Sequence, residues 1–342
     1  MARLWLRHEA RETERRAAVT PADAARLVAA GNQVTVERSP QRVFPIEDYA
    51  AAGCGVAPAG SWIDAPDDTW VIGLKELPAE PAALRHRHVY FGHAYKGQPG
   101  AAALLHRFTT GGGRLLDLEY LTDEHGRRLA AFGYWAGYVG AALAILHLRG
   151  TLETPLRPLR RADLDAALAA PGEHPRVLVV GALGRGGRGA RDACAAAGIR
   201  PTAWDLAETR HLDRSALLAH HILVNTVLSS GPATPLLTEA DLDDPARALR
   251  VISDVTCDVG SACNVLPVYD RVTTWAKPVR PLREGARPVD LIAIDNLPSL
   301  LPRESSESFS AELADHLLDL TSPPWARAAG QFRAATEEKT HV

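Results

Sequence analysis

The sequence has few cysteines, one methionine and almost no charge imbalance, and each absence argues against a class of protein. Its 38 basic and 41 acidic residues give a net charge of −3. No basic block offers a counterion-releasing surface, which argues against a nucleic-acid partner. The cysteines, which form no CxxC pair and no ladder of histidine and cysteine ligands, are Cys54, Cys194, Cys257 and Cys263. We therefore expect no bound metal, no disulfide framework and a reducing, cytoplasmic location.

Long uncharged runs are also scarce. Residues 1–9 gain charge after a few positions, which is not the pattern of a signal peptide. One run, at residues 129–148, is nearly free of charge and long enough to span a bilayer. It stands alone and carries Gly133, Gly137 and Gly140 at a spacing that suits close helix packing. We interpret it as a buried helix of a globular protein and predict no membrane association.

The rest of the composition is typical of a soluble α/β protein with two domains. The 342 residues are 46% hydrophobic and 23% charged, which is enough for a sizeable core. Strand-like apolar runs alternate with helical patterns, and a second series begins at residue 176. Strands are expected at residues 3–7, 33–37, 70–74, 89–93, 114–118, 176–180, 201–205, 222–225, 250–254 and 290–295, and helices at 21–31, 99–109, 129–148, 160–170, 308–320 and 325–335.

The most specific local motif follows the strand at residues 176–180. Its glycines are spaced Gly-x-x-Gly-x-x-Gly, and a helical pattern continues to Gly198. Such a turn lets the backbone approach a pyrophosphate, whose charge then faces exposed N–H groups and the positive end of the helix dipole. The motif predicts a dinucleotide site at Gly181, Gly184, Arg185, Gly186 and Gly187.

Asp205 indicates which dinucleotide is bound. It lies at the end of the next expected strand, where a carboxylate suits the ribose hydroxyls of the adenosine and would repel a 2′-phosphate. NAD is therefore favoured over NADP. Two alternatives stay open, namely a glycine-rich turn without a ligand, and a phosphate ester held by Arg185 and Arg188.

Lysine is nearly absent, since only four of the 38 basic residues are lysine. They are Lys75, Lys96, Lys277 and Lys339. Arginine stays protonated in proteins, whereas a desolvated lysine can act as a general base. Lys75 follows the strand at residues 70–74 and His93 ends the next one, so parallel neighbours would bring both to one sheet edge. We predict a functional role for Lys75 and His93. The alternative is that both are surface residues retained by chance. We accept that alternative for Lys339.

Six separated motifs resemble one enzyme family, in unbroken order from the first strand to Trp325. They lie at residues 16–21, 73–76, 92–96, 126–133, 181–186 and 294–304. Together they resemble the saccharopine dehydrogenases that form L-lysine with NAD, relatives of the alanine dehydrogenase and transhydrogenase group. The resemblance implies two Rossmann-like domains with parallel sheets flanked by helices and a cleft between them. It assigns substrate binding and catalysis to residues 1–131 plus 309–342, and NAD binding to residues 132–308.

The resemblance also implies a reaction and its catalytic residues. The family oxidises the secondary amine of saccharopine, and the imine takes up water and collapses to lysine and 2-oxoglutarate. Hydride leaves only when the nitrogen is neutral, so two proton carriers are needed. By resemblance, Lys75 deprotonates the amine and His93 serves water attack and carbinolamine breakdown. Glu76 and Glu119 would tune the pKa values of this pair.

The binding residues are implied in the same way. The substrate bears three carboxylates, which planar guanidinium groups bind bidentately. The candidates are Arg16, Arg128, Arg127 and Gln98 for the substrate, with Asp254 and Asp295 on the cofactor side. Structural alternatives stay open, because Arg16 could pair with Glu12 or Glu14, and the adjacent arginines could be the solvated face of a hairpin.

One segment departs from the family pattern. Residues 254–267 keep the acidic residues and Asn264 but lack the proline and histidine expected around that asparagine. Three functions therefore stay open: a saccharopine dehydrogenase, an opine-type or alanine-type dehydrogenase using another amine and 2-oxo acid, and an NAD-binding regulator without activity. Retention of Lys75 and His93 argues against the regulator. The sequence carries no sign of oligomeric state.

Overall fold

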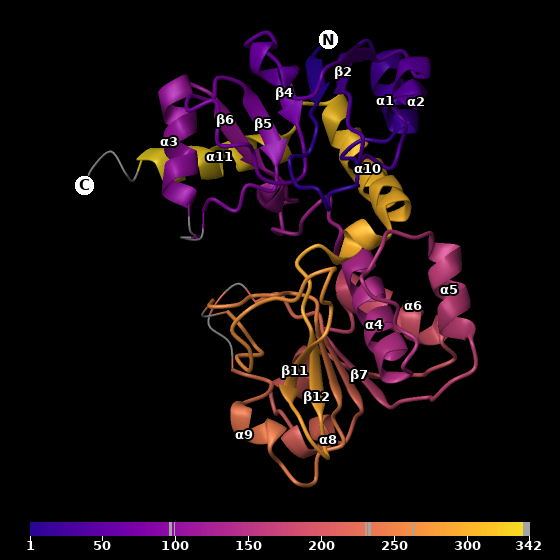
Figure 1. Cartoon of the computed structure of the whole chain (residues 1–342). Coiled ribbons are helices and arrows are strands. Elements are labelled where there is room, and N and C mark those ends of the chain that lie inside the picture. Colours follow the sequence, from indigo (N-terminus) through magenta and orange to yellow (C-terminus); the bar gives the residue numbers. More distant parts are fainter. Residues whose placement is uncertain (96–97, 99, 230, 232–233, 262, 338–342) are drawn as a thin grey trace. The chain divides into compact units, whose positions relative to one another are not determined.

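The computed structural model describes residues 1–95, 98, 100–229, 231, 234–261 and 263–337, so Lys96 and Lys339 lie outside the described residues. The chain divides into two compact units (Figure 1). One consists of Met1–Ala131 with Ser305–Val342, and the other of Phe132–Glu304. The two ends of the chain therefore belong to one unit, and the middle of the chain forms the other.

The first unit contains a sheet of six parallel strands. The strands are β1 (Arg3–Leu6), β2 (Gln33–Glu37), β3 (Gly55–Ala57), β4 (Trp70–Ile72), β5 (Arg87–Tyr90) and β6 (Arg114–Asp117). Their order in space is β3-β2-β1-β4-β5-β6, so the chain builds outward on one side from β1 and on the other from β4. The loops that leave the carboxyl ends of such neighbours diverge, which makes this point the usual ligand site of an open α/β sheet.

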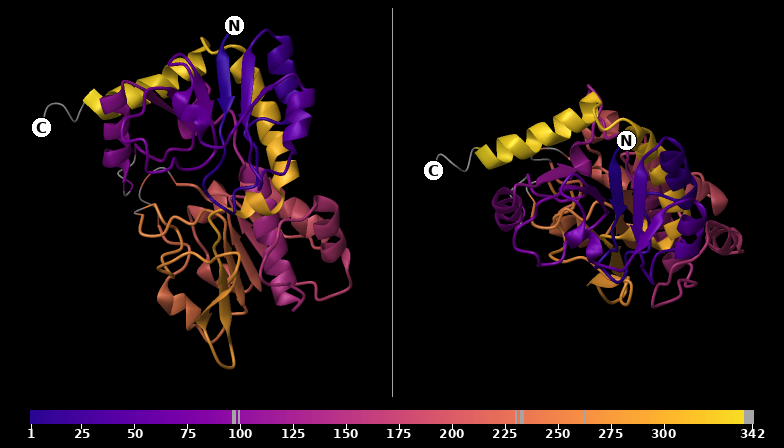
Figure 2. Two further views of the ribbon diagram at one scale, coloured as in Figure 1. Left: turned by 45° about the horizontal axis from the view of Figure 1, so that its top comes forward. Right: turned by 90° about the horizontal axis from the view of Figure 1, so that it is seen from above.

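The last helices of the chain complete this unit. Its helices are α1 (Pro21–Ala29), α2 (Ile46–Ala51), α3 (Ala101–Gly111), α10 (Pro302–Leu318) and α11 (Pro323–Glu337), with 3₁₀ turns η1 (Ser61–Asp64) and η2 (Leu118–Tyr120). Thr20 caps α1, its hydroxyl accepting from the backbone N–H of Asp23. The α10 helix lies beside α1 (Figure 2), where the Ser310 hydroxyl accepts from the Thr20 N–H at 2.9 Å.

The second unit contains a sheet of order β11-β12-β10-β9-β7-β8. Its strands are β7 (Val177–Val180), β8 (Thr202–Trp204), β9 (Ile222–Asn225), β10 (Val251–Asp254), β11 (Arg280–Arg283) and β12 (Val289–Ile292). Its helices are α4 (Gly133–Leu148), α5 (Arg161–Ala169), α6 (Arg185–Ala196), α7 (Leu206–Thr209), α8 (Arg214–Leu218) and α9 (Glu239–Leu242), with the 3₁₀ turn η3 (Leu297–Leu300). All pairs are parallel except the edge pair of β11 with β12.

The apolar run predicted to be a buried helix forms α4 in the core of the second unit. Its glycines allow very close packing on α6, as the spacing predicts. A Cβ atom at Gly137 would overlap the Gly186 carbonyl, and one at Gly189 would overlap the Tyr134 carbonyl. No helix among the described residues is long and apolar enough to cross a membrane.

The predicted α/β class is confirmed, whereas some element boundaries are wrong. The strand expected at residues 89–93 is β5, which ends at Tyr90. It begins earlier because His88 is buried against Trp62 and Phe108. The prediction also missed α2, β3, the antiparallel β11 and the short helices α7–α9, since a few residues are too short to display a period.

Candidate active site

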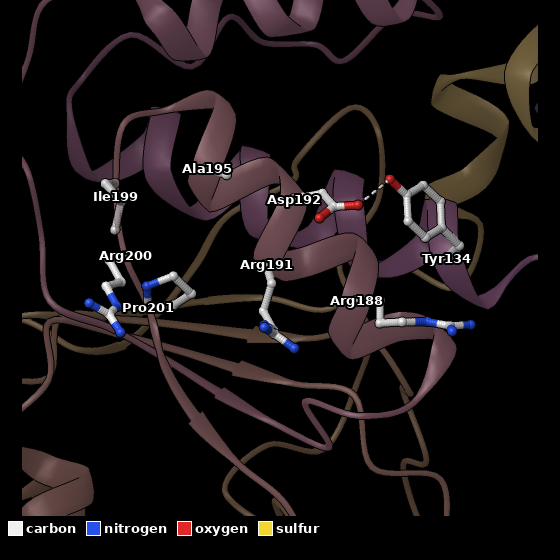
Figure 3. Close-up of a pocket in the computed structure, with 8 residues that line it drawn as sticks. All are labelled: Tyr134, Arg188, Arg191, Asp192, Ala195, Ile199, Arg200 and Pro201. Atoms are coloured by element: carbon white, nitrogen blue, oxygen red, sulfur yellow. Dashed lines mark hydrogen bonds between the residues drawn. The ribbon is translucent and has the colours of Figure 1, made fainter.

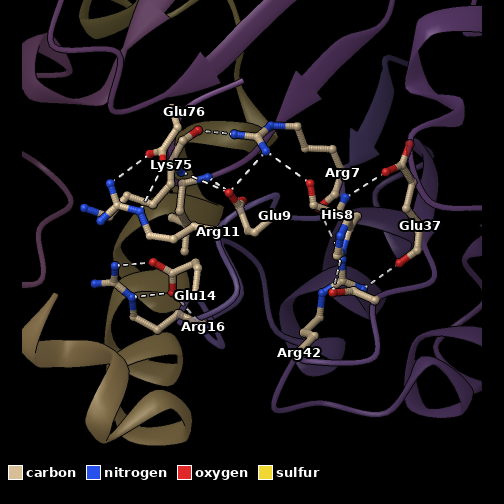
Figure 4. Close-up of polar contacts among 12 residues, drawn as sticks. Arg7, His8, Glu9, Arg11, Glu14, Arg16, Glu37, Arg42, Lys75 and Glu76 are labelled. Carbon is tan, nitrogen blue, oxygen red and sulfur yellow. Dashed lines mark hydrogen bonds and ion pairs between the residues drawn. The ribbon is translucent and has the colours of Figure 1, made fainter. Parts of the chain in front are cut away.

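The loop after β4 carries Lys75 and Glu76 at the carboxyl edge where β1 and β4 meet (Figure 4). Arg11, from the loop after β1, forms a bidentate ion pair with Glu76, in which Nε lies 2.9 Å from Oε1 and Nη2 lies 3.1 Å from Oε2. Burial alone would raise the pKa of Glu76, but the pairing with Arg11 and the charge of Lys75 bring it below its ordinary value. Glu76 is therefore an anion beside Lys75 at neutral pH.

Arg16 forms a buried bidentate pair with Glu14. Its Nε lies 2.8 Å from Oε1 and its Nη2 2.6 Å from Oε2, and both side chains are at most 4% exposed. Burial would raise the pKa of Glu14, but Arg16, with a smaller contribution from the Lys75 charge, lowers it. This pair is the structural alternative weighed for Arg16, and a substrate carboxylate would meet an arginine already bound to Glu14.

His93 lies beyond the end of β5 and has a strained backbone. Its φ of 49° is in the left-handed region, which is costly for a residue with a Cβ and is found most often at functional sites. Its half-exposed ring places Nδ1 3.5 Å from Oε2 of Glu119, which follows β6. Hydrogen bonding to Glu119 raises the pKa of His93, while burial and the charge of Lys75 oppose this rise. The predicted pair of Lys75 and His93 thus lies within mutual electrostatic reach.

Asp117 lies within electrostatic reach of His93 and was not predicted from the sequence. It ends β6, is fully buried, and its Oδ1 accepts from the Glu119 N–H at 2.9 Å. Burial raises the pKa of Asp117 to about 6, the charge of Glu119 adds to the rise, and His93 opposes it. The available signal was a second carboxylate, two residues before Glu119, at the end of an apolar strand.

The two adjacent arginines differ in their surroundings. Residues 121–129 form a hairpin in which Gly126 adopts a φ of 75°. Arg127 points to solvent and pairs with Asp123 at 2.7 Å, which is the solvated alternative. Arg128 is half-buried and has no hydrogen bond or ion pair to the described residues. Gln98 precedes α3, and its carbonyl accepts from the Ala101 N–H at 3.1 Å.

In the second unit the glycine turn links β7 to α6. Gly181 has a φ of 80°, and Gly184 is the N-cap residue of α6, with only the Gly181 carbonyl near its Cβ position. Asp205 faces the same turn from the end of β8. Its Oδ2 accepts from the Leu183 N–H and its Oδ1 from the Leu206 N–H, both at 2.9 Å. The α6 N-terminus, the open glycine turn and the acid therefore lie together, as a dinucleotide site requires.

The other predicted cofactor residues have internal contacts. A Cβ at Gly187 would overlap the Gly181 carbonyl, so this glycine lets α6 pack on the turn. Asp254 is fully buried and accepts from Asn225, Thr256 and Tyr269, the last at 2.7 Å, so a direct contact to a cofactor would have to replace one of these bonds.

The remaining predicted cofactor residues are more exposed than Asp254 and Gly187. Asp295 is exposed beyond β12, between this strand and η3. Arg185 opens α6 and is half-buried, directly after the N-cap Gly184. Gly186 follows it and faces Thr226, whose Cβ would be 3.1 Å from an added Cβ.

A separate surface pocket of the second unit contains none of the residues predicted to bind NAD or the substrate, but it includes Arg188 of the phosphate-ester alternative (Figure 3). It is lined by Tyr134, Arg188, Arg191, Asp192, Ala195, Ile199, Arg200 and Pro201. The Tyr134 hydroxyl donates to Asp192 at 2.6 Å, and its ring stacks edge-on against Trp135. The tyrosine thus serves packing on this face.

Comparison with known families places both halves of the chain. The alanine dehydrogenase/PNT N-terminal domain matches residues 5–139, and the alanine dehydrogenase/PNT C-terminal domain matches residues 164–340. Saccharopine dehydrogenase (NAD+, L-lysine-forming) of Neurospora crassa is 42% identical over 353 residues, covering 96% of this chain and 95% of that protein. The enzyme of the same name from Emericella nidulans is 41% identical, covering 98% and 97%.

Two solved structures share the fold at low identity. The transhydrogenase from Sinorhizobium meliloti superposes with a TM-score of 0.65 at 15% identity, covering 93% of each chain. An L-alanine dehydrogenase superposes with a TM-score of 0.68 at 15% identity, covering 96% of this chain and 93% of that one. The chain belongs to the alanine dehydrogenase/PNT family and, within it, to the saccharopine dehydrogenases (NAD+, L-lysine-forming).

Proposed function

We propose that this protein is an NAD-dependent oxidoreductase that converts saccharopine to L-lysine and 2-oxoglutarate, and catalyses the reductive amination in reverse. The observation that carries the proposal is the meeting of Lys75 and His93 at one edge of the first sheet, each beside a carboxylate. We place it in the cytoplasm, since its cysteines are all free thiols.

The cofactor belongs to the second unit. We assign NAD binding to residues 132–308, and substrate binding and catalysis to residues 1–131 plus 309–342. The glycine turn fits a pyrophosphate because Gly181 bends the backbone and α6 presents its N–H groups there. The Asp205 carboxylate suits the ribose hydroxyls. To accept a hydrogen bond from a hydroxyl through Oδ2, it would give up the hydrogen bond that it accepts from the Leu183 N–H. When bound, NAD accepts the hydride from the substrate carbon that carries the secondary amine.

Lys75 takes the proton from that amine. The nitrogen must be neutral before hydride leaves, so a base is needed beside it. Lys75 provides an amine that can lose its proton, unlike the arginines that fill nearly every other basic position. The carboxylates of Glu76 and Glu14 lie within electrostatic reach of Lys75, whose charge contributes to the lowered pKa of each of them.

His93 handles the water. The imine must take up hydroxide, and the carbinolamine must lose a proton from oxygen while its nitrogen gains one. A histidine whose pKa is raised by Glu119 can hold that proton near neutral pH and return it. The half-exposed ring of His93 leaves it in contact with solvent, which is the source of the water.

Arg128 and Arg16 bind substrate carboxylates. Arg128 has no competing partner among the described residues, so its planar fork can accept a carboxylate bidentately. Arg16 offers a guanidinium whose position Glu14 already fixes. Arg127 and Gln98 are further substrate-binding residues in this proposal.

An initial-rate assay of NADH oxidation tests the proposal. With 2-oxoglutarate present, lysine, ornithine, alanine and ammonia are supplied in turn. We expect turnover with lysine to exceed that with the other amines. Turnover with ornithine, alanine or ammonia instead would identify an opine-type or alanine-type dehydrogenase. NADH binding without turnover of any amine would identify a regulator.

A further inference from the structure

A buried ion pair follows β1 and has no part in the mechanism above. Nη1 of Arg7 lies 3.1 Å from Oε2 of Glu9, and the two side chains are 1% and 7% exposed. Burying two charges costs solvation energy that their mutual attraction alone seldom recovers, so such a pair calls for further contacts. Three of those contacts lie on Leu74 and Lys75, in the loop after β4.

The contacts to this loop centre on the backbone of Lys75 (Figure 4). The Glu9 carboxylate accepts from the N–H of Leu74 at 2.7 Å and from the N–H of Lys75 at 3.0 Å. The Arg7 guanidinium donates through Nη2 to the carbonyl of Lys75 and through Nη1 to the carbonyl of His8. The ion pair therefore binds both the N–H and the C=O of the residue proposed to be the base.

The surrounding residues leave room for this arrangement. A Cβ atom at Gly73 would overlap the Arg7 guanidinium, so the glycine allows the arginine to lie across the loop. On its other side the guanidinium lies over the ring of Tyr90, 5.6 Å from the centroid. Arg7 is thus fixed by a glycine, an aromatic face and a carboxylate before it reaches Lys75.

We propose that Arg7 and Glu9 are positioning residues that fix the Lys75 peptide and so aim the Lys75 amine at the substrate nitrogen. The proposal rests on the function proposed above. Holding the backbone suits a residue that gains and loses a proton. The contacts of Arg7 and Glu9 to the backbone N–H and C=O of Lys75 are the same whether the Lys75 amine is charged or neutral. The Lys75 side chain therefore extends from the same backbone position throughout the catalytic cycle. The neighbouring Arg11–Glu76 pair fixes the next residue from the same loop.

The Glu9→Gln variant tests this role, because it keeps the size of the side chain. Its amide group replaces one acceptor with a donor that faces the Lys75 or Leu74 N–H, and it leaves the Arg7 charge unpaired. A displacement of about 1 Å at a reacting group can cost roughly a hundredfold in rate. We expect kcat for lysine and 2-oxoglutarate to fall by about tenfold to a hundredfold, with NADH affinity changed less than about twofold. The limb of the pH–rate profile that belongs to the base should move as well.

Asp23→Asn is the matched control. Asp23 also lies in the first unit, is largely buried, and pairs with Arg26 at 2.9 Å, but it contacts α10 and not Lys75. Both variants should lower the melting temperature, whereas only Glu9→Gln should change kcat and the pH profile. Equal effects of the two variants on kcat would overturn the proposal, as would an unchanged kcat in Glu9→Gln.

A second readout does not depend on activity. Because the chain has only four lysines, reductive ¹³C-methylation yields few amine signals, and Lys75→Arg identifies the one from Lys75. We expect Glu9→Gln to shift that signal and Asp23→Asn to leave it in place; an unmoved signal in Glu9→Gln would refute the positioning role. Arg7→Lys keeps the positive charge but loses the planar guanidinium, so it should also shift the Lys75 signal. If Glu9→Gln does not fold, the result for Arg7→Lys tests the positioning role instead. An inactive wild-type protein in the lysine assay would instead refute the proposed function.

Discussion

Replacing the buried Asp117 with asparagine should stabilise the protein while it impairs catalysis. Burial raises the pKa of this carboxyl from 3.8 to about 6. Each pKa unit corresponds to about 1.4 kcal/mol, so the charged form costs the folded protein up to about 3 kcal/mol at neutral pH. The Gly92 amide favours the charged form and would face the new amide group. We therefore expect a net gain of about 1–3 kcal/mol for Asp117→Asn at pH 7.5.

The gain should depend on pH in a defined direction. Between about pH 4 and 6 the folded protein retains a proton on Asp117 that the unfolded chain releases. The stability contribution of Asp117 therefore falls as the pH rises through this window, and its full cost is present above the window. Below it, wild type and variant are both neutral at this position, so their difference in stability should vanish.

The same substitution should disturb His93. The charge of Asp117 contributes to the raised pKa of His93, and its Oδ1 holds the backbone of Glu119. Without this charge, the limb of the pH–rate profile that belongs to His93 should move to lower pH. Urea denaturation at pH 7.5 and pH 4 measures the change in the free energy of unfolding. Hydrogen exchange of the β5 and β6 amides is a second, local measurement of the same change. A variant that is no more stable at pH 7.5, or that gains equally at both pH values, would refute the reasoning.

Three further predictions concern the proposed roles. Lys75→Met should lower turnover by roughly a hundredfold or more while NADH binding survives in a fluorescence titration, and near-normal activity in Lys75→Arg would contradict its assignment as the base. Arg128→Lys should weaken 2-oxoglutarate binding by about tenfold in isothermal titration and leave NADH affinity unchanged. Arg16→Lys should weaken 2-oxoglutarate binding in the same way, and it should also lower the melting temperature because it breaks the bidentate pair with Glu14. If NADH affinity fell equally in these variants, the arginines would be structural. Asp205→Ala should narrow the preference for NAD over NADP, and equal affinities in the unmodified protein would remove Asp205 from this role.

Local sequence patterns predicted the features that depend on neighbours along the chain. The glycine turn, the start of α6 and the acid after β8 are formed within one strand–turn–helix unit, so spacing alone locates them. The exits of β4 and β5 likewise placed Lys75 and His93 at one sheet edge, because parallel strands end on the same side. The strained backbone of His93 was not predicted, since the sequence pattern there suits an extended strand.

The sequence alone therefore determined the α/β class, the dinucleotide turn and the position of the two residues proposed to carry protons, whereas only the tertiary structure revealed which side chains surround those two residues. Arg7 and Glu9 read as ordinary polar residues after a strand, yet they are buried against a loop some 65 positions later. Asp117 likewise becomes a perturbed acid only because folding buries its side chain at the end of β6. The physical reason is that periodicity and turn chemistry act between near neighbours, while the burial of a charge depends on partners that folding brings from distant parts of the chain.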